Sequence, residues 1–199
     1  MCLSFVSCNG DLTIDGALNG IIDSYSASTL DSLRMMDLTN DAIYGKSAVS
    51  STGKFSMTLG KPVGTKFSPG TGVTVSDPNT FVSMSMLAAV KSGSLKGVVL
   101  KNNFTHSSST TTVGDAMVMF MYADRPCTVK GTITNGNQSL VYDMNLVKGW
   151  NEVVGKVTAY SASASSETVS YSSIIPSDLK YRYISTISYV KRFQIRGLN

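Results

Sequence analysis

Apolar and polar residues alternate with a period of two along much of this chain. Residues 12–18 show the pattern, and in residues 54–59 an apolar side chain stands at every second position. Such alternation is typical of strands that bury one face. The same reasoning predicts further strands at 32–38, 81–87, 97–101, 116–123, 127–133, 139–147, 150–157, 168–171 and 183–195.

Turn residues separate the predicted strands. Asn135-Gly136 lies between two alternating runs, and this dipeptide is the strongest short-range signal of a β-hairpin. Residues 147–150 hold a second tight turn. Helical patterns are confined to a turn or two at 31–38 and 176–180. Short strands with regular turns between them predict an all-β protein, folded as a sandwich or a barrel.

A passage rich in Gly, Pro, Ser and Thr, residues 60–78, divides these strands into two groups. We therefore predict a first β-sandwich at 9–62, a linker at 63–78, and a larger antiparallel β-sandwich or barrel at 79–199. Residues 1–8 are interpreted as the remnant of a lipoprotein signal.

That interpretation rests on Cys8. A short apolar run ends at Ser7 and Cys8, and a polar segment follows at once, which resembles the end of a bacterial lipoprotein signal peptide. We expect a lipid on Cys8. A secretory signal needs basic residues and about 7–15 apolar residues before its cleavage site, and residues 1–7 supply neither. A longer leader, or an ordinary N-terminus with incidental cysteines, therefore stays open.

Composition excludes several classes of protein. The chain has 199 residues, of which 15% are charged, whereas about 25% is usual for globular domains. No apolar run reaches the roughly 18 residues of a membrane-spanning helix. The net charge of +4 is spread thinly, which argues against a nucleic-acid partner.

Residues 180–196 interleave aromatic and basic side chains, and we interpret them as a terminal strand. If Cys8 carries the lipid and Cys2 leaves with the leader, Cys127 has no cysteine to pair with, and a disulfide framework is not possible.

Two stretches carry a resemblance to known families. Residues 16–20 (Gly-Ala-Leu-Asn-Gly) with residues 50–59 (Ser-Ser-Thr-Gly-Lys-Phe-Ser-Met-Thr-Leu) resemble the prealbumin-like, carboxypeptidase-regulatory-like β-sandwich. Residues 124–132 and 142–153, the latter with Gly-Trp-Asn, are similar to a recurring segment of uncharacterised bacterial surface lipoproteins. The resemblance covers about half the chain. It implies a fold and an envelope location and transfers no catalytic residue.

Candidate chemistry is sparse. His106 is the only histidine, and it lies in a polar stretch that offers no partners for a metal or a catalytic triad. Residues 37–41 supply oxygen atoms but lack the spacing and the closing Glu of a calcium loop. The sequence contains no phosphate-binding loop. We therefore predict no catalytic residue, no metal and no cofactor.

Three side chains are candidates for ligand binding. Trp150 and Glu152 stand beside a predicted hairpin and could hold a sugar, with Tyr142 as part of an aromatic platform. The alternative is that Trp150 closes the end of a core while Glu152 faces water. We favour the core position for Trp150.

These observations predict a non-enzymatic, lipid-anchored protein of the bacterial cell envelope, on the outer membrane or the periplasmic face. It would bind a ligand or assist surface assembly, with a surface glycan or another envelope protein as partner. A carbohydrate-binding module is the first alternative. A hydrolase on a β-sandwich scaffold is the second, because sandwiches host sites that spacing does not reveal.

Overall fold

The structure is a computed structural model that describes residues 16–37, 40–68, 70–105 and 111–185. These residues form fourteen strands and no helix. The prediction of an all-β protein is therefore confirmed. The strands are Ala17–Ile21 (β1), Ser32–Asp37 (β2), Ile43–Ala48 (β3), Lys54–Thr58 (β4), Thr65–Lys66 (β5), Val73–Val75 (β6), Phe81–Lys91 (β7), Ser94–Asn102 (β8), Ala116–Ala123 (β9), Cys127–Asn135 (β10), Gln138–Leu146 (β11), Gly149–Ser161 (β12), Ser166–Ser172 (β13) and Lys180–Ile184 (β14).

Twelve of the strands belong to one large sheet, and β1 and β4 form a small second sheet. The large sheet has the order β3-β2-β7-β8-β9-β12-β13-β11-β10-β6, with β14 beside β8 and β5 beside β7. This order ends at β3 and at β6, so the described strands do not close into a barrel. The barrel alternative was wrong, and the sandwich-like all-β description stands.

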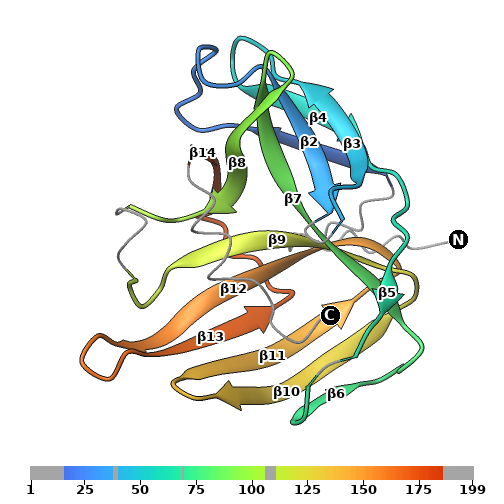
Figure 1. Ribbon diagram of the computed structural model, residues 1–199, viewed down its shortest axis with the longest axis vertical. Helices are drawn as coiled ribbons and strands as arrows, with labels where there is room; N and C mark the ends of the chain where they lie inside the picture. The colour runs from blue at the N-terminus through green and yellow to red at the C-terminus, as the bar shows by residue number, and fades with distance from the viewer. Residues whose placement is uncertain (1–15, 38–39, 69, 106–110, 186–199) are drawn as a thin grey trace, which may run out of the picture.

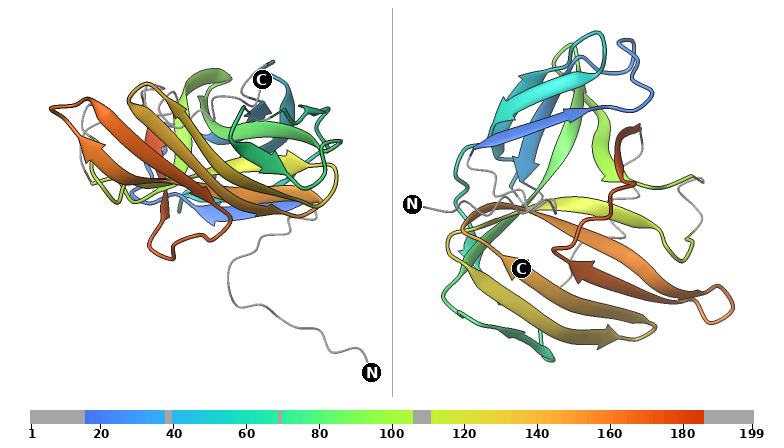
Figure 2. Two further views of the ribbon diagram at one scale, coloured as in Figure 1. Left: turned by 90° about the horizontal axis from the view of Figure 1, so that it is seen from below. Right: turned by 180° about the vertical axis from the view of Figure 1, so that it is seen from behind.

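The strands are arranged in two lobes (Figure 1). In the upper lobe, β1 and β4 lie side by side over β2, β7 and β8 (Figure 2). In the lower lobe, β9 to β13 form a curved sheet with β6 at its edge. Strand β7 runs through both lobes and pairs with β2, β5, β8 and β9 along its length. Isolated bridges at Ile22–Tyr181 and Val49–Phe55 tie the small sheet to its neighbours.

Three clusters of buried apolar side chains stabilise this arrangement. The upper core comprises Leu18, Ile22, Leu30, Leu33, Met35, Phe55, Met57, Leu59, Leu87, Ala89, Val99, Phe120, Tyr122, Trp150 and Tyr181. The lower core comprises Phe67, Val82, Val98, Leu100, Phe104, Met117, Met119, Met121, Ala123, Cys127, Val129, Leu140, Tyr142, Met144, Leu146, Val153, Val157, Val169 and Tyr171. A small side core comprises Ala116, Val118, Val154 and Leu179.

Strand β9 shows why its sequence is apolar without interruption. All eight of its residues are buried. Met117, Met119 and Met121 contact the lower core, while Phe120 and Tyr122 contact the upper core. Successive side chains of a strand point to opposite faces, so a strand covered on both faces needs apolar residues at every position.

Several strand boundaries differ from the prediction. Strand β3 was missed because Ile43–Ala48 does not alternate clearly in sequence, and its residues are exposed or half-buried. Residues 32–37 form a strand, so the helical alternative there was wrong. Of the predicted strand at 12–18, residues 12–15 lie outside the described residues, as do residues 186–195 of the last predicted strand.

The hairpin predicted at Asn135-Gly136 is present, but its two-residue loop begins at Gly136 and not at Asn135. Asn135 pairs with Gln138, so the loop residues are Gly136 and Asn137. Gly136 has a φ of 58°, whereas Asn137 is not among the residues with positive φ. This is the arrangement of a type II′ turn, which places Gly at the first loop position.

Backbone pairing crosses the segment that was predicted as a linker. Strand β2 pairs with β7 over six register positions, which joins residues before and after 63–78 in one sheet. The same segment contains the short strands β5 and β6. The division into two domains and the prealbumin-like topology of residues 9–62 remain predictions.

Candidate functional site

Trp150 belongs to the upper core and is 2% exposed. Its indole Nε1 donates a hydrogen bond of 3.1 Å to the carbonyl oxygen of Gly60. The ring is 5.7 Å from that of Tyr122 and 5.9 Å from that of Tyr44, measured between centroids. Tilted and edge-to-face contacts of this kind are favourable for aromatic pairs. This is the core position that the sequence favoured.

Glu152 is also buried, which corrects the expectation that it faces water. It is 5% exposed, and its Oε2 accepts a bond of 2.8 Å from Lys101 Nζ. The hydroxyl of Tyr181 donates a longer bond of 3.4 Å to Oε1, and burial raises the pKa of that tyrosine. Strand β9 lies between β8 and β12, so the Lys101–Glu152 pair bridges over it. On β12, Glu152 lies between Trp150 of the upper core and Val154 of the side core, on the same face of the strand.

Tyr142 belongs to the lower core and is 4% exposed. Its ring stacks on that of Tyr171 at 5.2 Å between centroids, with the two planes inclined by 15°. Its hydroxyl has no hydrogen-bond partner among the described residues, and burial raises its pKa to about 12. The structure therefore places Trp150 and Glu152 on one face of β12 and Tyr142 in a different cluster. A ligand-binding role for these three remains a prediction.

A second buried acid, Asp37, has its own hydrogen-bond donors. It is 4% exposed. Ser83 Oγ donates to its Oδ2 at 2.7 Å, and the Tyr44 hydroxyl donates to the same atom at 3.1 Å. Burial is the main cause of the raised pKa of Tyr44. Buried acids with such partners are typical of structural networks.

The two buried acids lie on strands that are three steps apart in the sheet. Strand register connects Asp37 to Ser85, Ser85 to Phe120, and Phe120 to Glu152. Three steps between neighbouring strands span about 14 Å along the sheet. Paired carboxylates that cleave glycosides lie roughly 5 to 10 Å apart. Each acid has its own local hydrogen-bond partners, Ser83 and Tyr44 for Asp37 and Lys101 and Tyr181 for Glu152.

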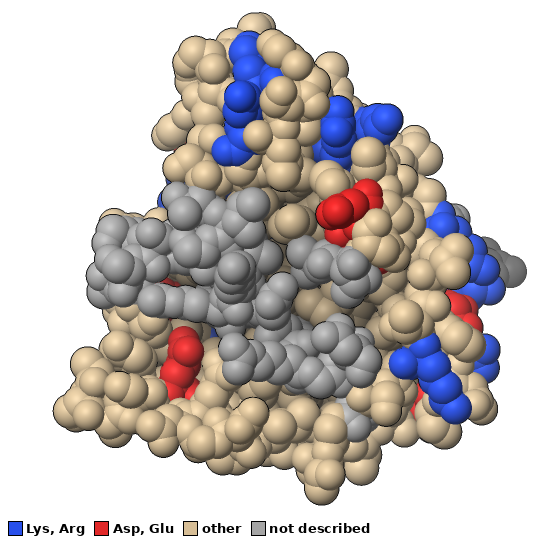
Figure 3. Space-filling model, in the orientation of Figure 1, with Lys and Arg blue, Asp and Glu red and all other residues tan. Residues whose placement is uncertain are grey.

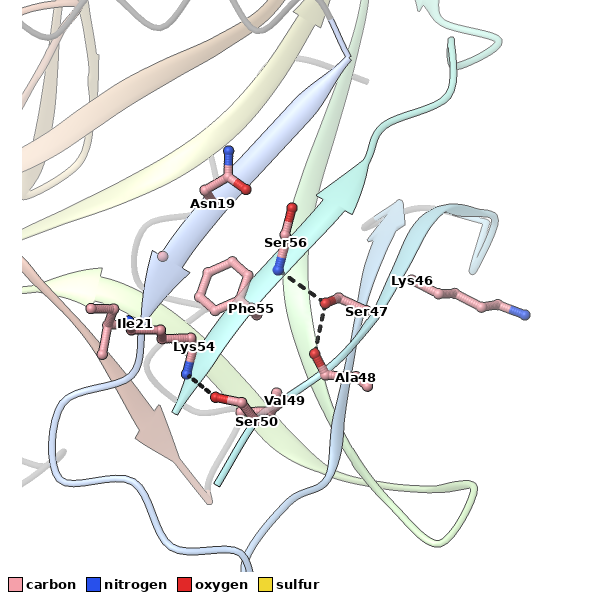
Figure 4. Close-up of a pocket in the computed structure, with 11 residues that line it drawn as sticks. Asn19, Ile21, Lys46, Ser47, Ala48, Val49, Ser50, Lys54, Phe55 and Ser56 are labelled. Atoms are coloured by element: carbon pink, nitrogen blue, oxygen red, sulfur yellow. Dashed lines mark hydrogen bonds between the residues drawn. The ribbon is translucent and has the colours of Figure 1, made fainter. Parts of the chain in front are cut away.

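A surface depression of the upper lobe forms a groove over β1, β3 and β4 (Figure 4). We call it the β1–β3–β4 groove, and it has a volume of about 950 Å³. The residues that line it are Asn19, Gly20, Ile21, Lys46, Ser47, Ala48, Val49, Ser50, Lys54, Phe55 and Ser56.

Local sequence explains how the groove forms. Alternation directs Phe55 inward and leaves Lys54 and Ser56 on the outer face of β4. Position 20 requires glycine, because a β-carbon there would lie within 2.8 Å of the rings of Phe55 and Tyr181. Larger residues at position 20 would separate β1 from these rings.

Serine hydroxyl groups in β3 and in the turn after it bind backbone amides of β4. Ser47 Oγ accepts a bond of 3.1 Å from the Ser56 amide and donates one of 2.7 Å to the Ala48 carbonyl. Ser50 Oγ accepts a bond of 3.0 Å from the Lys54 amide. These bonds replace a regular ladder between β3 and β4, for which the structure shows one isolated bridge, Val49–Phe55.

The charged side chains that line the groove are all positive. Lys46 and Lys54 lie on opposite sides of it in Figure 4. Within the described part of the chain, neither ammonium group has an ion pair, and no carboxylate is among the lining residues. Figure 3 shows Lys and Arg side chains over the same lobe. The groove therefore combines positive charge with hydroxyl and amide groups.

Sequence reasoning did not identify this groove. Asn19 and Ser56 are polar residues at outward positions of two strands, and they lie opposite each other in the β1–β4 register. The alternation indicated that each faces solvent. It did not indicate that the strands pair, because contacts between distant segments leave no periodic signal.

The other candidates offer little chemistry. Cys127 is a free, buried thiol, and burial raises its pKa, which disfavours the reactive thiolate. Among the described residues, no group of three or more His, Cys, Asp or Glu is placed to hold a metal. Cys8 and His106 lie outside the described residues. No helix in the described ranges is long and apolar enough to span a membrane.

Comparisons with protein-family models, curated proteins and solved structures find no match to this chain. Its function must therefore be inferred from its own residues and their geometry.

Proposed function

We propose that this chain is a non-enzymatic, lipid-anchored protein of the bacterial cell envelope that binds an anionic, hydroxyl-rich ligand in the β1–β3–β4 groove. The observation that carries the proposal is the pair of lysines without ion-pair partners, among the described residues, in a groove lined otherwise by hydroxyl, amide and apolar groups. We further propose that the upper lobe is prealbumin-like.

The lining suits an acidic sugar. Ammonium groups form charge-assisted hydrogen bonds with carboxylates. Ser and Asn side chains both donate to and accept from hydroxyl groups, and Asn19, Ser50 and Ser56 provide them here. The volume of about 950 Å³ lies in the range of small-molecule sites, roughly 300–1,000 Å³.

An enzymatic role finds less support. Asp37 and Glu152 are each occupied by local partners, and neither lines the groove. A carbohydrate platform built on Trp150 would need surface that a 2% exposed side chain does not present. The hydrolase alternative therefore rests on no residue arrangement described above.

The membrane anchor is proposed from Cys8 alone. Labelling cells with a palmitate analogue should mark the protein, and Cys8→Ser should abolish the mark. Cys127→Ser is the matched control and should keep it. An unlabelled wild-type protein in the soluble fraction would contradict the lipid anchor. It would not affect the proposal that the groove binds a ligand.

The groove is tested by titration with trigalacturonate, with the uncharged galactose trimer as control. We expect saturable binding of the acidic trimer that weakens as salt is added, since screening reduces exposed charge interactions. Lys46→Gln with Lys54→Gln should weaken binding about tenfold or more. Lys156→Gln changes an exposed lysine outside the groove and should leave it unchanged. Equal binding by all these variants, or no binding by the wild type, would contradict the proposal.

A further inference from the structure

The ends of two hairpins enclose a second hollow at one edge of the lower lobe. Strands β11 and β13 are parallel neighbours, so the β10–β11 and β12–β13 hairpins turn at the same edge of the sheet. Asn137 joins the two turns. Its Nδ2 donates to the Ala164 carbonyl at 3.0 Å, and its own carbonyl accepts from the Glu167 amide at 2.9 Å. The hollow between them has a volume of about 370 Å³.

Strand register places three polar side chains in a row beside this hollow. Tyr160 pairs with Glu167, and Glu167 pairs with Gln138. Residues paired across strands point to the same face of a sheet. The aromatic ring, the carboxylate and the amide therefore stand next to one another on three adjacent strands, at spacings of about 5 Å.

A β-bulge creates this row. The β12–β13 register shifts between Val157 and Ala159, so Thr158 is an extra residue. If Thr158 instead paired regularly with Thr168, Ala159 would oppose Glu167 and the ring of Tyr160 would point to the other face. Bulges commonly re-aim a side chain in this way. As a result Tyr160 is 42% exposed beside the hollow, whereas Tyr142 and Tyr171 are buried in the lower core.

The lining has a different chemistry from that of the β1–β3–β4 groove. No lysine or arginine is among its residues, which are Thr134, Gly136, Asn137, Gln138, Ser139, Ala159, Tyr160, Ser161, Ser166, Glu167 and Thr168. Hydroxyl and amide groups dominate, with a single carboxylate. An anionic ligand would find no cation among these lining residues.

We propose that this hollow is a second binding site, and that it takes a neutral hexose unit of a glycan. The face of an aromatic ring is apolar and slightly negative, and it packs against the C–H groups on one face of a pyranose. The amide of Gln138 and the carboxylate of Glu167, next in the row, bind hydroxyl groups at the edge of the same sugar. A volume of about 370 Å³ suits one or two sugar rings.

The test uses the full chain and a panel of neutral hexamers: β-1,4-glucose, α-1,4-glucose, β-1,4-mannose and β-1,4-galactose. Calorimetric titration should show saturable binding of at least one hexamer. Tyr160→Ala should weaken it about tenfold, as expected for one lost aromatic contact and its hydrogen bonds. Tyr160→Phe retains the ring and should stay within about threefold of the wild type.

Two controls distinguish this hollow from the rest of the protein surface. Phe81 is equally exposed at 42% and does not line the hollow, so Phe81→Ala should bind like the wild type. The Lys46→Gln, Lys54→Gln variant should also bind normally, so failure of the proposed anion groove does not affect this result. Gln138→Ala tests the row without removing the ring and should weaken binding. Absence of binding to all four hexamers, or unchanged binding by Tyr160→Ala, would overturn the proposal.

Discussion

Truncation of Trp150 should destabilise the protein strongly if the side chain closes the upper core. The indole is 2% exposed, contacts the rings of Tyr122 and Tyr44, and donates a hydrogen bond to Gly60. Trp150→Ala removes all of these contacts and leaves a cavity. Buried aromatic truncations of this kind cost about 3–5 kcal/mol of unfolding free energy. In a chain of this size, that corresponds to a melting temperature lower by roughly 6–20 °C.

Urea denaturation followed by circular dichroism measures this change, because Trp150→Ala removes the single tryptophan. Trp150→Phe is the matched control. It retains most of the apolar ring but leaves the Gly60 carbonyl without its donor, which should cost about 1–3 kcal/mol. In the wild type, tryptophan emission should be blue-shifted and should move to the red on unfolding. A cost below about 1 kcal/mol for Trp150→Ala would show that the ring is not a core side chain.

Buried polar groups and close backbone packing give three further predictions about stability. The raised pKa of Tyr142, about 12, means that the unfolded chain ionises this phenol from about pH 10 while the folded protein does not. Tyr142 alone should therefore contribute about 3 kcal/mol to the fall in unfolding free energy from pH 10 to 12, and Tyr142→Phe, whose stability at pH 7 should not drop, should lose less by that amount. Lys101→Met should cost about 3–5 kcal/mol by leaving the Glu152 carboxylate unpaired, and adding Glu152→Leu should recover much of that loss; additive costs in denaturation would contradict the pairing. Gly131→Ala should unfold the β6–β10 edge, since a β-carbon there would overlap the Gly72 carbonyl at a φ of 134°; unchanged hydrogen exchange in that edge would refute this.

Local patterning was sufficient to predict the all-β class and most of the strands. In β4, Phe55 and Met57 are buried and their neighbours are exposed, as the alternation indicates. The unbroken apolar run of β9 indicated a strand but not that two separate cores cover its faces. Strand β3 has no comparable pattern, because its residues lie at the rim of the upper lobe.

Features that depend on distant pairing were not predictable from the sequence. Glu152 is buried because Lys101, 51 residues earlier, reaches over β9 to pair with it. Tyr160 faces the hollow because one bulge residue changes its direction. The parallel alignment of β11 and β13 arises because β13 follows β12 in a hairpin and then fits beside β11. None of these relations has a signature in local periodicity.

The most decisive test of the proposed anion groove is to map where an acidic sugar contacts the protein. Amide spectra of the isotope-labelled chain should be recorded as trigalacturonate is added. We expect shifts concentrated in residues 19–21, 46–50 and 54–56, which line the β1–β3–β4 groove, and their loss in the Lys46→Gln, Lys54→Gln variant. Shifts confined to the hairpin ends at 134–139 and 159–168, or no shifts at all, would refute binding in the groove.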